Sequence, residues 1–198
     1  MRIRDNDKVA LVKQKAMVLM VQYGFEGFSM NKLARACGIS VATLYIYYKD
    51  KDDLIVQIGQ EEGIKMNEQV LLGFDPESDF ETGLWQQWQN RAAYMLEHPV
   101  AMMFFDQLRC STYHSCVIGS IMVDFKQAME RFTNNAVQRG EIDELPLGIY
   151  WSLAFSPLYT LLRFHTQGKS VGGVPFVLDE PLMRATFGRV LRSLKKNN

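Results

Sequence analysis

The sequence has few cysteines and no long apolar run. Its 198 residues include three cysteines, Cys37, Cys110 and Cys116, without repeated spacing, which argues against a disulfide framework and favours a reducing compartment. No stretch approaches the roughly 18 apolar residues that a membrane span needs. The first twenty residues are charged where a signal peptide would be apolar. We therefore expect a cytoplasmic protein that has no membrane partner.

The sequence also has few residues in the arrangements typical of catalytic or metal-binding motifs. None of the three histidines lies in a recognisable catalytic motif. Cys110, His114 and Cys116 are close in sequence, but residues 111–113 resemble a break between helices, and no fourth zinc ligand is evident. We expect no catalytic residue, no metal site and no cofactor.

The chain has no net charge, but its charge is unevenly distributed. Residues 1–51 hold nine Lys and Arg against four Asp and Glu, whereas residues 52–198 hold thirteen against eighteen. A basic N-terminal quarter suits a polyanion such as DNA, and an ordinary solvated helix face would give the same balance. Charge alone leaves both interpretations open.

Apolar residues recur with helical spacing along most of the chain, so we predict an all-α fold. The first helix is expected over about 6–23, with Gly24 as its left-handed stop, and two short helices follow Ser29 and Ser40. Later helices are expected at about 51–73, 79–97, 99–109, 115–139, 146–167 and 179–196. Pro157 should kink or break the helix that contains it. The domain boundary is predicted inside the helix that begins near Lys51, giving domains 1–53 and 54–198.

Residues 28–45 have the pattern of a helix-turn-helix. A small core between two crossed helices is predicted from Leu33, Ala34, Ile39 and Leu44, while Gly38 permits a tight turn. In this geometry the second helix enters the major groove of DNA and the first crosses the backbone. The N-terminal domain is therefore expected to be a three-helix DNA-binding domain.

The turn and the second helix belong to a longer motif, a G-(I/V)-S-x-x-T-L-Y-x-(Y/H)-(F/Y) run followed by a turn, a lysine, acidic residues and a leucine. The residues that fit this motif in order are Gly38, Ile39, Ser40, Thr43, Leu44, Tyr45, Tyr47, Tyr48, Lys51 and Leu54. In this motif the region resembles the tetracycline-repressor (TetR) family, over about 45 residues. Gly24-Phe25 and Phe28-Ser29 also match the family's entry into its second helix.

The resemblance implies roles for individual side chains. Phosphates would be held by Thr43, Tyr45, Tyr47 and Lys51, and Ser40 would help to position the DNA backbone. Base selection would fall to Asn31, Val41, Ala42 and Thr43. The alternative for the tyrosines is aromatic core, which we prefer for Tyr48 alone. Three positions depart from the family by being apolar, so base readout is expected to depend on van der Waals contact; these are Met30, Val41 and Ile46.

In the C-terminal domain the resemblance is architectural, and it implies an effector cavity and a four-helix dimer interface. Aromatic and thioether side chains concentrate there, as in apolar small-molecule pockets. For any single one of them ordinary core packing is the better explanation, and only the cluster supports a pocket. The candidate effector residues are Trp85, Trp88, Phe104, Phe125, Met129, Trp151, Phe155 and Tyr159. The candidate dimer residues, taken from the apolar stripes of the last two helices, are Leu158, Leu162, Phe187 and Leu191.

The sequence thus predicts a homodimeric repressor that binds palindromic operator DNA and is released by a small apolar or aromatic effector. Two alternatives stay open. One is an enzyme built on a helical bundle, and the other is a DNA-binding protein that responds to no ligand. Turnover without DNA binding would favour the first alternative, and ligand-induced release from DNA would exclude the second.

Overall fold

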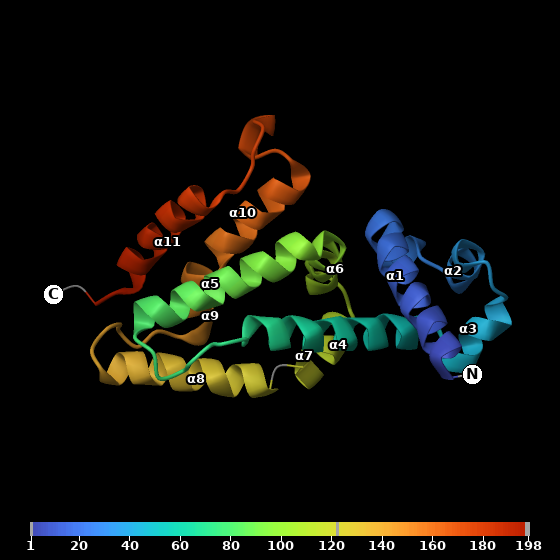
Figure 1. Ribbon diagram of the computed structural model, residues 1–198, viewed down its shortest axis with the longest axis horizontal. Helices are drawn as coiled ribbons and strands as arrows, with labels where there is room; N and C mark the ends of the chain where they lie inside the picture. Colours follow the sequence, from blue (N-terminus) through green and yellow to red (C-terminus); the bar gives the residue numbers. More distant parts are fainter. Residues whose placement is uncertain (1, 122, 197–198) are drawn as a thin grey trace. The chain divides into compact units, whose positions relative to one another are not determined.

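The computed structural model describes residues 2–121 and 123–196, which form helices joined by short loops (Figure 1). The helices are α1 (Arg2–Gly27), α2 (Met30–Cys37), α3 (Val41–Tyr47), α4 (Lys51–Val70), α5 (Phe80–Glu97), α6 (Pro99–Arg109), α7 (His114–Ile121), α8 (Val123–Gln138), α9 (Leu147–Ala154), α10 (Ser156–Gln167), the 3-10 turn η1 (Val171–Gly173) and α11 (Glu180–Leu194). The described residues form no β-strand, only two isolated bridges. The predicted all-α class is confirmed. In the described ranges, no helix is both long and apolar enough to cross a membrane.

The chain folds into two compact units. The head unit contains α1, α2, α3, α4 as far as Lys65, α6 and α7. The body unit contains the end of α4 together with α5, α8, α9, α10 and α11. The boundary at 65/66 and the predicted boundary at 53/54 both fall within α4. The functional division at 53/54 stays a prediction, because packing alone does not show which partner each part binds.

The head unit has one continuous apolar core. Side chains of α1 recur at three- and four-residue steps and are fully or almost fully buried, which is the main source of stability for an amphipathic helix. Every helix of the unit contributes to this core, which includes Val12, Ala16, Met20, Leu33, Leu44, Leu54, Ile58, Phe104, Leu108, Val117 and Ile121.

Two glycines let α7 approach α4 closely. A Cβ atom added to Gly59 would lie 2.8 Å from Cγ2 of Val117, and one added to Gly63 would overlap Ile121. Larger residues at either position would push the two helices apart. The close contact makes α7 part of the head unit, although it lies far from the N-terminal helices in sequence.

The body unit surrounds α5, whose buried face includes Trp88 and Arg91. The predicted break at Pro157 is confirmed, because α9 ends at Ala154 and α10 begins at Ser156. Pro157 has no N–H to continue the helix. At the same break, the carbonyl of Ala154, the last residue of α9, accepts a hydrogen bond of 2.8 Å from Nε1 of Trp88. This carbonyl is therefore satisfied within the body unit.

The segment predicted as one helix over 115–139 is helical on both sides of Met122. Helix α7 ends at Ile121 and α8 begins at Val123, and Met122 itself lies outside the described residues. The prediction that one helix runs through this position stays a prediction. Helix α7 buries apolar side chains in the core of the head unit, whereas α8 belongs to the body unit.

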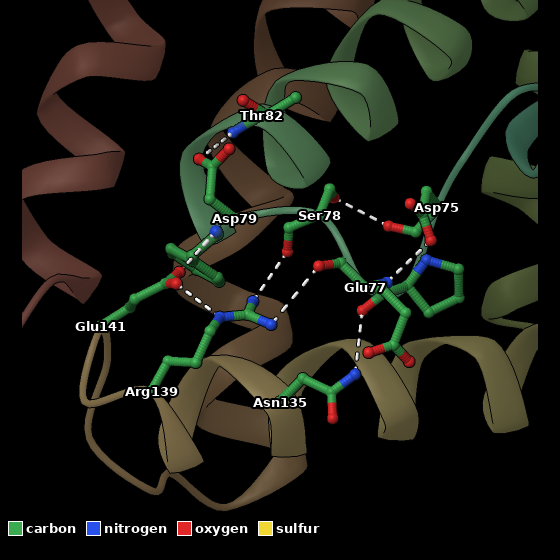
Figure 2. Close-up of polar contacts among 10 residues, drawn as sticks. Asp75, Glu77, Ser78, Asp79, Thr82, Asn135, Arg139 and Glu141 are labelled. Carbon is green, nitrogen blue, oxygen red and sulfur yellow. Dashed lines mark hydrogen bonds and ion pairs between the residues drawn. The ribbon is translucent and has the colours of Figure 1, made fainter.

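A polar network fixes the loop that leads into α5 (Figure 2). Arg139, just after α8, donates to the carbonyl of Ser78 at 2.7 Å and to Glu141 at 2.6 Å. Asp79 accepts the N–H of Thr82, a hydrogen bond that lowers the pKa of the Asp79 carboxyl, and Glu141 accepts the N–H of Phe80. Two carboxylates thus cap the N-terminus of α5, where negative charge is favourable.

Candidate nucleic-acid interface

The turn between α2 and α3 has the conformation that its sequence requires. Gly38 adopts a left-handed backbone with φ of +67°, and its N–H bonds to the carbonyl of Arg35 at 3.2 Å. The N–H of Ile39 reaches the carbonyl of Ala34 at 3.0 Å. Only glycine adopts this φ without strain, so Gly38 sets the angle at which α3 leaves α2.

Serines begin both helices, as predicted. The hydroxyl of Ser29 accepts the N–H of Lys32 at 3.3 Å, and that of Ser40 accepts the N–H of Thr43 at 3.1 Å. The oxygens Ser40 Oγ and Thr43 Oγ1 are also 2.9 Å apart. These caps satisfy backbone donors at the start of each helix, and the second cap brings the hydroxyls of Ser40 and Thr43 together at the N-terminus of α3.

The predicted core of the helix-turn-helix is confirmed. Leu33, Ala34 and Leu44 are buried, and Ile39 packs partly buried against the same cluster. Met30 is buried there as well. The expectation that Met30 takes part in base readout is therefore wrong, because its side chain fills the gap beneath α2. The other two apolar departures differ: Val41 is half-buried and Ile46 is 75% exposed.

Burial separates the three tyrosines of this region. Tyr45 and Tyr47 are 52% and 38% exposed, whereas Tyr48 is 2% exposed and packs in the core. The inward orientation predicted for Tyr48 is confirmed, and the alternative of a core role does not hold for the other two. Among the described residues, the Tyr48 hydroxyl has no hydrogen-bond partner. Burial raises the pKa of Tyr48 to about 12, with a smaller contribution from Glu61 and Asp53.

The other candidate DNA contacts lie at the surface of the head unit. Asn31, Ser40 and Ala42 are exposed, and Thr43 and Lys51 are half-buried. The helix-turn-helix and the first turn of α4 therefore bring hydroxyls, phenols and an ammonium, each at least partly exposed, into one segment of the chain, residues 31–51. Their roles in phosphate contact and base selection stay predictions.

The turn before Lys51 is rigid. Asp50 accepts the N–H of Asp53 at 2.8 Å, and the Asp53 carboxylate accepts the N–H of Lys49 at 2.8 Å. Hydrogen bonds from Gln57 and from the Lys49 backbone lower the pKa of Asp53. This reciprocal capping fixes the first turn of α4, which carries Lys51.

Two side chains from outside the N-terminal quarter hold α1 and α4, the helices that precede and follow the helix-turn-helix. Tyr113 donates to Asp52 Oδ1 at 2.6 Å, and Nε2 of Gln107 donates to the carbonyl of Val21 at 2.9 Å. The ring of Tyr113 also contacts that of Phe25, with centroids 5.4 Å apart. These partners are 61 and 86 residues apart in sequence, so no local pattern could have indicated them.

The three cysteines are free thiols. Cys110 and Cys116 are exposed and Cys37 is half-buried, all three unbridged. Cys110 follows α6 and His114 begins α7, which confirms the predicted break at 111–113. Over the described ranges, no group of three or more His, Cys, Asp or Glu side chains is positioned to hold a metal ion.

Most candidate effector residues lie in the body unit, namely Trp85, Trp88, Phe125, Met129, Trp151, Phe155 and Tyr159. Phe104 is the exception. It is buried in the core of the head unit, where its ring centroid is 5.7 Å from that of Phe25. Trp85 and Trp88 pack on Phe187 with centroid distances of 4.9 and 5.4 Å. Trp151 and Phe155, by contrast, surround a charged residue, Arg91.

All four candidate dimer residues are buried within a single protomer. Leu158 and Leu162 have no exposed surface, and Phe187 and Leu191 are 6% and 7% exposed. These side chains fill the protomer's own core, because one apolar stripe of a helix must cover its own domain first. Their assignment to a dimer interface is not supported by this burial and stays an untested prediction.

Comparison with known proteins agrees with this geometry. Residues 14–58 match the sequence model of the family described as bacterial regulatory proteins, tetR family. The chain is 23% identical over 178 residues to an uncharacterized HTH-type transcriptional regulator of Haemophilus influenzae, covering 90% of each protein. A crystal structure of a TetR family transcription regulator from Marinobacter aquaeolei VT8 matches all of both chains with a TM-score of 0.78 and 25% identity.

A second crystal structure, of a putative tetR family transcription regulator from Shewanella sp. PV-4, shares the fold. It covers 96% of this chain and 99% of its own, with a TM-score of 0.76 and 16% identity. The match to the family's sequence model spans the helix-turn-helix, and the structural match extends over the body unit. The helix-turn-helix segment therefore matches the model of the TetR family, and the whole chain has the fold of a TetR family transcription regulator.

Proposed function

We propose that the protein is a homodimeric repressor that binds a two-fold symmetric operator and is released by a small apolar or aromatic effector. The observation that carries the proposal is the contrast between exposed Tyr45 and Tyr47 and buried Tyr48. Both exposed rings lie at the surface of the head unit, where DNA phosphates can approach them. Because bacterial DNA lies in the cytoplasm, the proposal puts the protein in that compartment.

On the operator, two classes of contact are expected. Tyr45, Tyr47, Thr43 and Lys51 donate to phosphates and fix the register of the head without reading sequence. Asn31, Val41 and Ala42 contact base edges in the major groove, with Ala42 and Val41 suited to thymine methyl groups. The exposed Ile46 adds apolar surface beside them.

A dimer follows from the geometry of the operator. A single head reads one half-site, and two heads joined by a two-fold axis read two half-sites about one helical turn apart. The relatives named above are regulators of a family that acts as dimers, which supports the same arrangement. In this dimer, exposed side chains of the last helices would form the interface. The packing of these helices would be fixed by buried residues of the same protomer, namely Leu158, Leu162, Phe187 and Leu191.

Effector release requires a ligand that binds more tightly to a conformation with low operator affinity. Helix α4 begins in the head unit and ends in the body unit, so it belongs to both. The hydrogen bonds of Tyr113 and Gln107 tie α6 and the following turn to the head. A coupling free energy of about 1–3 kcal/mol would change operator affinity roughly 5- to 150-fold.

The experiment is a selection of bound fragments from genomic DNA at near-physiological salt, followed by operator titration with candidate effectors. The expected result is enrichment of a palindromic site and loss of binding when an effector is added. Sequence-independent retention of fragments would contradict the operator, and an isotherm that no ligand shifts would leave a ligand-independent DNA-binding protein. Promoter activity with and without the protein separates repression from activation.

A further inference from the structure

Helix α5 buries a guanidinium that no carboxylate neutralises. Arg91 is 2% exposed, and no carboxylate of a described residue forms an ion pair with it. Its Nε donates to the hydroxyl of Tyr159 at 3.1 Å, and Nη1 donates to the backbone carbonyl of Gln87 at 3.2 Å and to its side-chain oxygen. Its Nη2 donates to no described residue.

Aromatic rings surround the same charge. The guanidinium carbon lies 4.1 Å from the ring centroid of Phe155, 5.3 Å from that of Phe125 and 5.7 Å from that of Trp151. Cation–π contacts of this kind compensate part of the cost of desolvation. Neutral acceptors and ring faces nevertheless leave a full positive charge in an apolar setting, and such charges are normally paired.

The hydroxyl of Tyr150 is a second polar group buried in the same cluster. Tyr150 is 4% exposed, and its hydroxyl has no hydrogen-bond partner among the described residues. Its ring contacts Phe155 with centroids 6.1 Å apart. Burial raises the pKa of Tyr150 far above its ordinary value, and the charge of Arg91 partly opposes this rise. The phenol is therefore within electrostatic range of the guanidinium and stays protonated.

The Arg91 guanidinium and the Tyr150 hydroxyl are both hydrogen-bond donors, so their complement is an acceptor with negative charge. A carboxylate matches the planar fork of a guanidinium with two parallel hydrogen bonds and carries the single charge that Arg91 needs. A phosphate dianion would leave excess negative charge in the apolar surroundings. Trp151 and Tyr159, which contact the guanidinium, are half-buried, so the cluster around Arg91 extends to the surface of the body unit.

We propose that the body unit binds a small monocarboxylate, with its carboxylate on Arg91 and its apolar part against Phe125, Trp151 and Phe155. The proposal deepens the proposed function, because this ligand would be the effector, but its binding is measurable without DNA. The acid group refines the earlier expectation of an effector that is only apolar or aromatic. Tyr150 provides a second donor for the same ligand.

The test compares each acid with its neutral amide on the full-length protein. The probes are benzoate and benzamide, phenylacetate and phenylacetamide, and octanoate and octanamide. Tryptophan fluorescence and thermal shift report binding, since Trp151 borders the site. The wild-type protein is expected to bind at least one acid about tenfold or more tightly than its amide, as the strength of charge-assisted hydrogen bonds implies.

Variants distinguish a specific contact between the acid and Arg91 from a general attraction of the acid to positive charge on the protein. Arg91→Met should remove the preference for the acid, and Tyr150→Phe should weaken acid binding several-fold while preserving the fold. Arg184→Met is the matched control, because Arg184 also lies over a tryptophan, 4.4 Å from the ring centroid of Trp85, but is exposed. It should leave the acid preference unchanged. If Arg91→Met does not fold, the acid–amide comparison on the wild-type protein and the acid affinity of Tyr150→Phe test the carboxylate site instead.

The outcomes distinguish this site from the proposed function. Equal affinity for acid and amide, no acid binding, or an acid preference that persists in folded Arg91→Met would overturn the carboxylate site. Acid binding that leaves operator affinity unchanged would support the site and contradict its role as the effector site. Neutral ligands that release the operator, without acid binding, would preserve the proposed function and overturn the role of Arg91.

Discussion

The hydroxyl of Tyr113 donates a 2.6 Å hydrogen bond to Oδ1 of Asp52. This bond joins the turn between α6 and α7 to the second residue of α4, next to Lys51. Both partners belong to the head unit. The position of a candidate phosphate contact therefore depends on a residue in the second half of the chain.

Replacing Tyr113 with phenylalanine removes this bond and preserves the ring contact with Phe25. We expect the free energy of unfolding to fall by about 1 kcal/mol and the melting temperature by about 2–4 °C. Operator affinity should fall modestly, because the first turn of α4 loses one support. Thermal unfolding and operator titration measure both effects. In a double-mutant cycle with Asp52→Ala, additive losses would show that the two side chains do not interact.

Two tyrosines three positions apart should respond oppositely to the loss of their hydroxyls. Tyr45→Phe should leave stability unchanged and weaken binding to all DNA sequences about 2- to 10-fold, the value of one hydrogen bond. Tyr48→Phe should leave DNA binding unchanged and raise the free energy of unfolding by about 1 kcal/mol, because a buried hydroxyl without a partner is costly. Equal effects of the two substitutions on DNA binding would contradict the assignment.

The same tyrosine makes stability dependent on alkaline pH. Burial raises the pKa of Tyr48 from 10.0 to about 12. Between pH 10 and 12 the folded state therefore retains the Tyr48 proton, whereas the unfolded state has lost it. The contribution of this ionisation to the free energy of unfolding is complete below pH 10 and declines as pH rises toward 12. Chemical unfolding of wild type and Tyr48→Phe over this window should give a shallower decline for the variant. Parallel curves would refute this.

Substitutions at the DNA face should separate affinity from sequence preference. Lys51→Ala should weaken binding to operator and random DNA alike and reduce the slope of log affinity against log salt by about 1. Asn31→Ala should instead alter the preferred bases at one position of each half-site. Fluorescence anisotropy at several salt concentrations, with a library of single-base operator variants, distinguishes them. An unchanged salt slope for Lys51→Ala would exclude its phosphate contact.

The glycines of α4 and α7 provide a matched pair for packing. Gly59→Ala brings a methyl group against Val117 and should destabilise the protein by about 1–3 kcal/mol, less its gain in helix propensity. Gly119→Ala, in α7, meets nothing within 4 Å and should stabilise by up to about 1 kcal/mol. Denaturant unfolding measures both. Stabilisation by Gly59→Ala would mean that α4 and α7 separate without cost.

Substitutions in α11 test where the dimer interface lies. Leu191 is 7% exposed, so Leu191→Glu should lower the melting temperature or prevent folding rather than release folded monomers. Leu182, in the same helix, is 37% exposed, and Leu182→Glu should preserve the fold of the protomer. Sedimentation of both variants measures association. A folded, monomeric Leu191→Glu protein would restore this residue to the interface.

The DNA-reading region could be predicted almost entirely from sequence, because its features are local. The caps at Ser29 and Ser40, the left-handed Gly38 and the break before Pro157 each depend on residues within four positions. Helix boundaries at Pro99 and near Asp79 follow from the same short-range rules. The division of residues 115–139 between the two units could not be predicted, because periodicity within one segment does not show that α7 and α8 belong to different cores.

By itself, then, the sequence determined the fold class, the helix-turn-helix and its resemblance to the TetR family. Only the tertiary structure decided that Met30 and the four candidate dimer residues are buried in the protomer, that Phe104 belongs to the head unit, and that Tyr113 supports α4. It also showed that Arg91 lies buried among aromatic rings. The physical reason is that capping and turn conformation involve neighbouring residues, whereas burial and the pairing of charges depend on contacts between segments far apart in the chain.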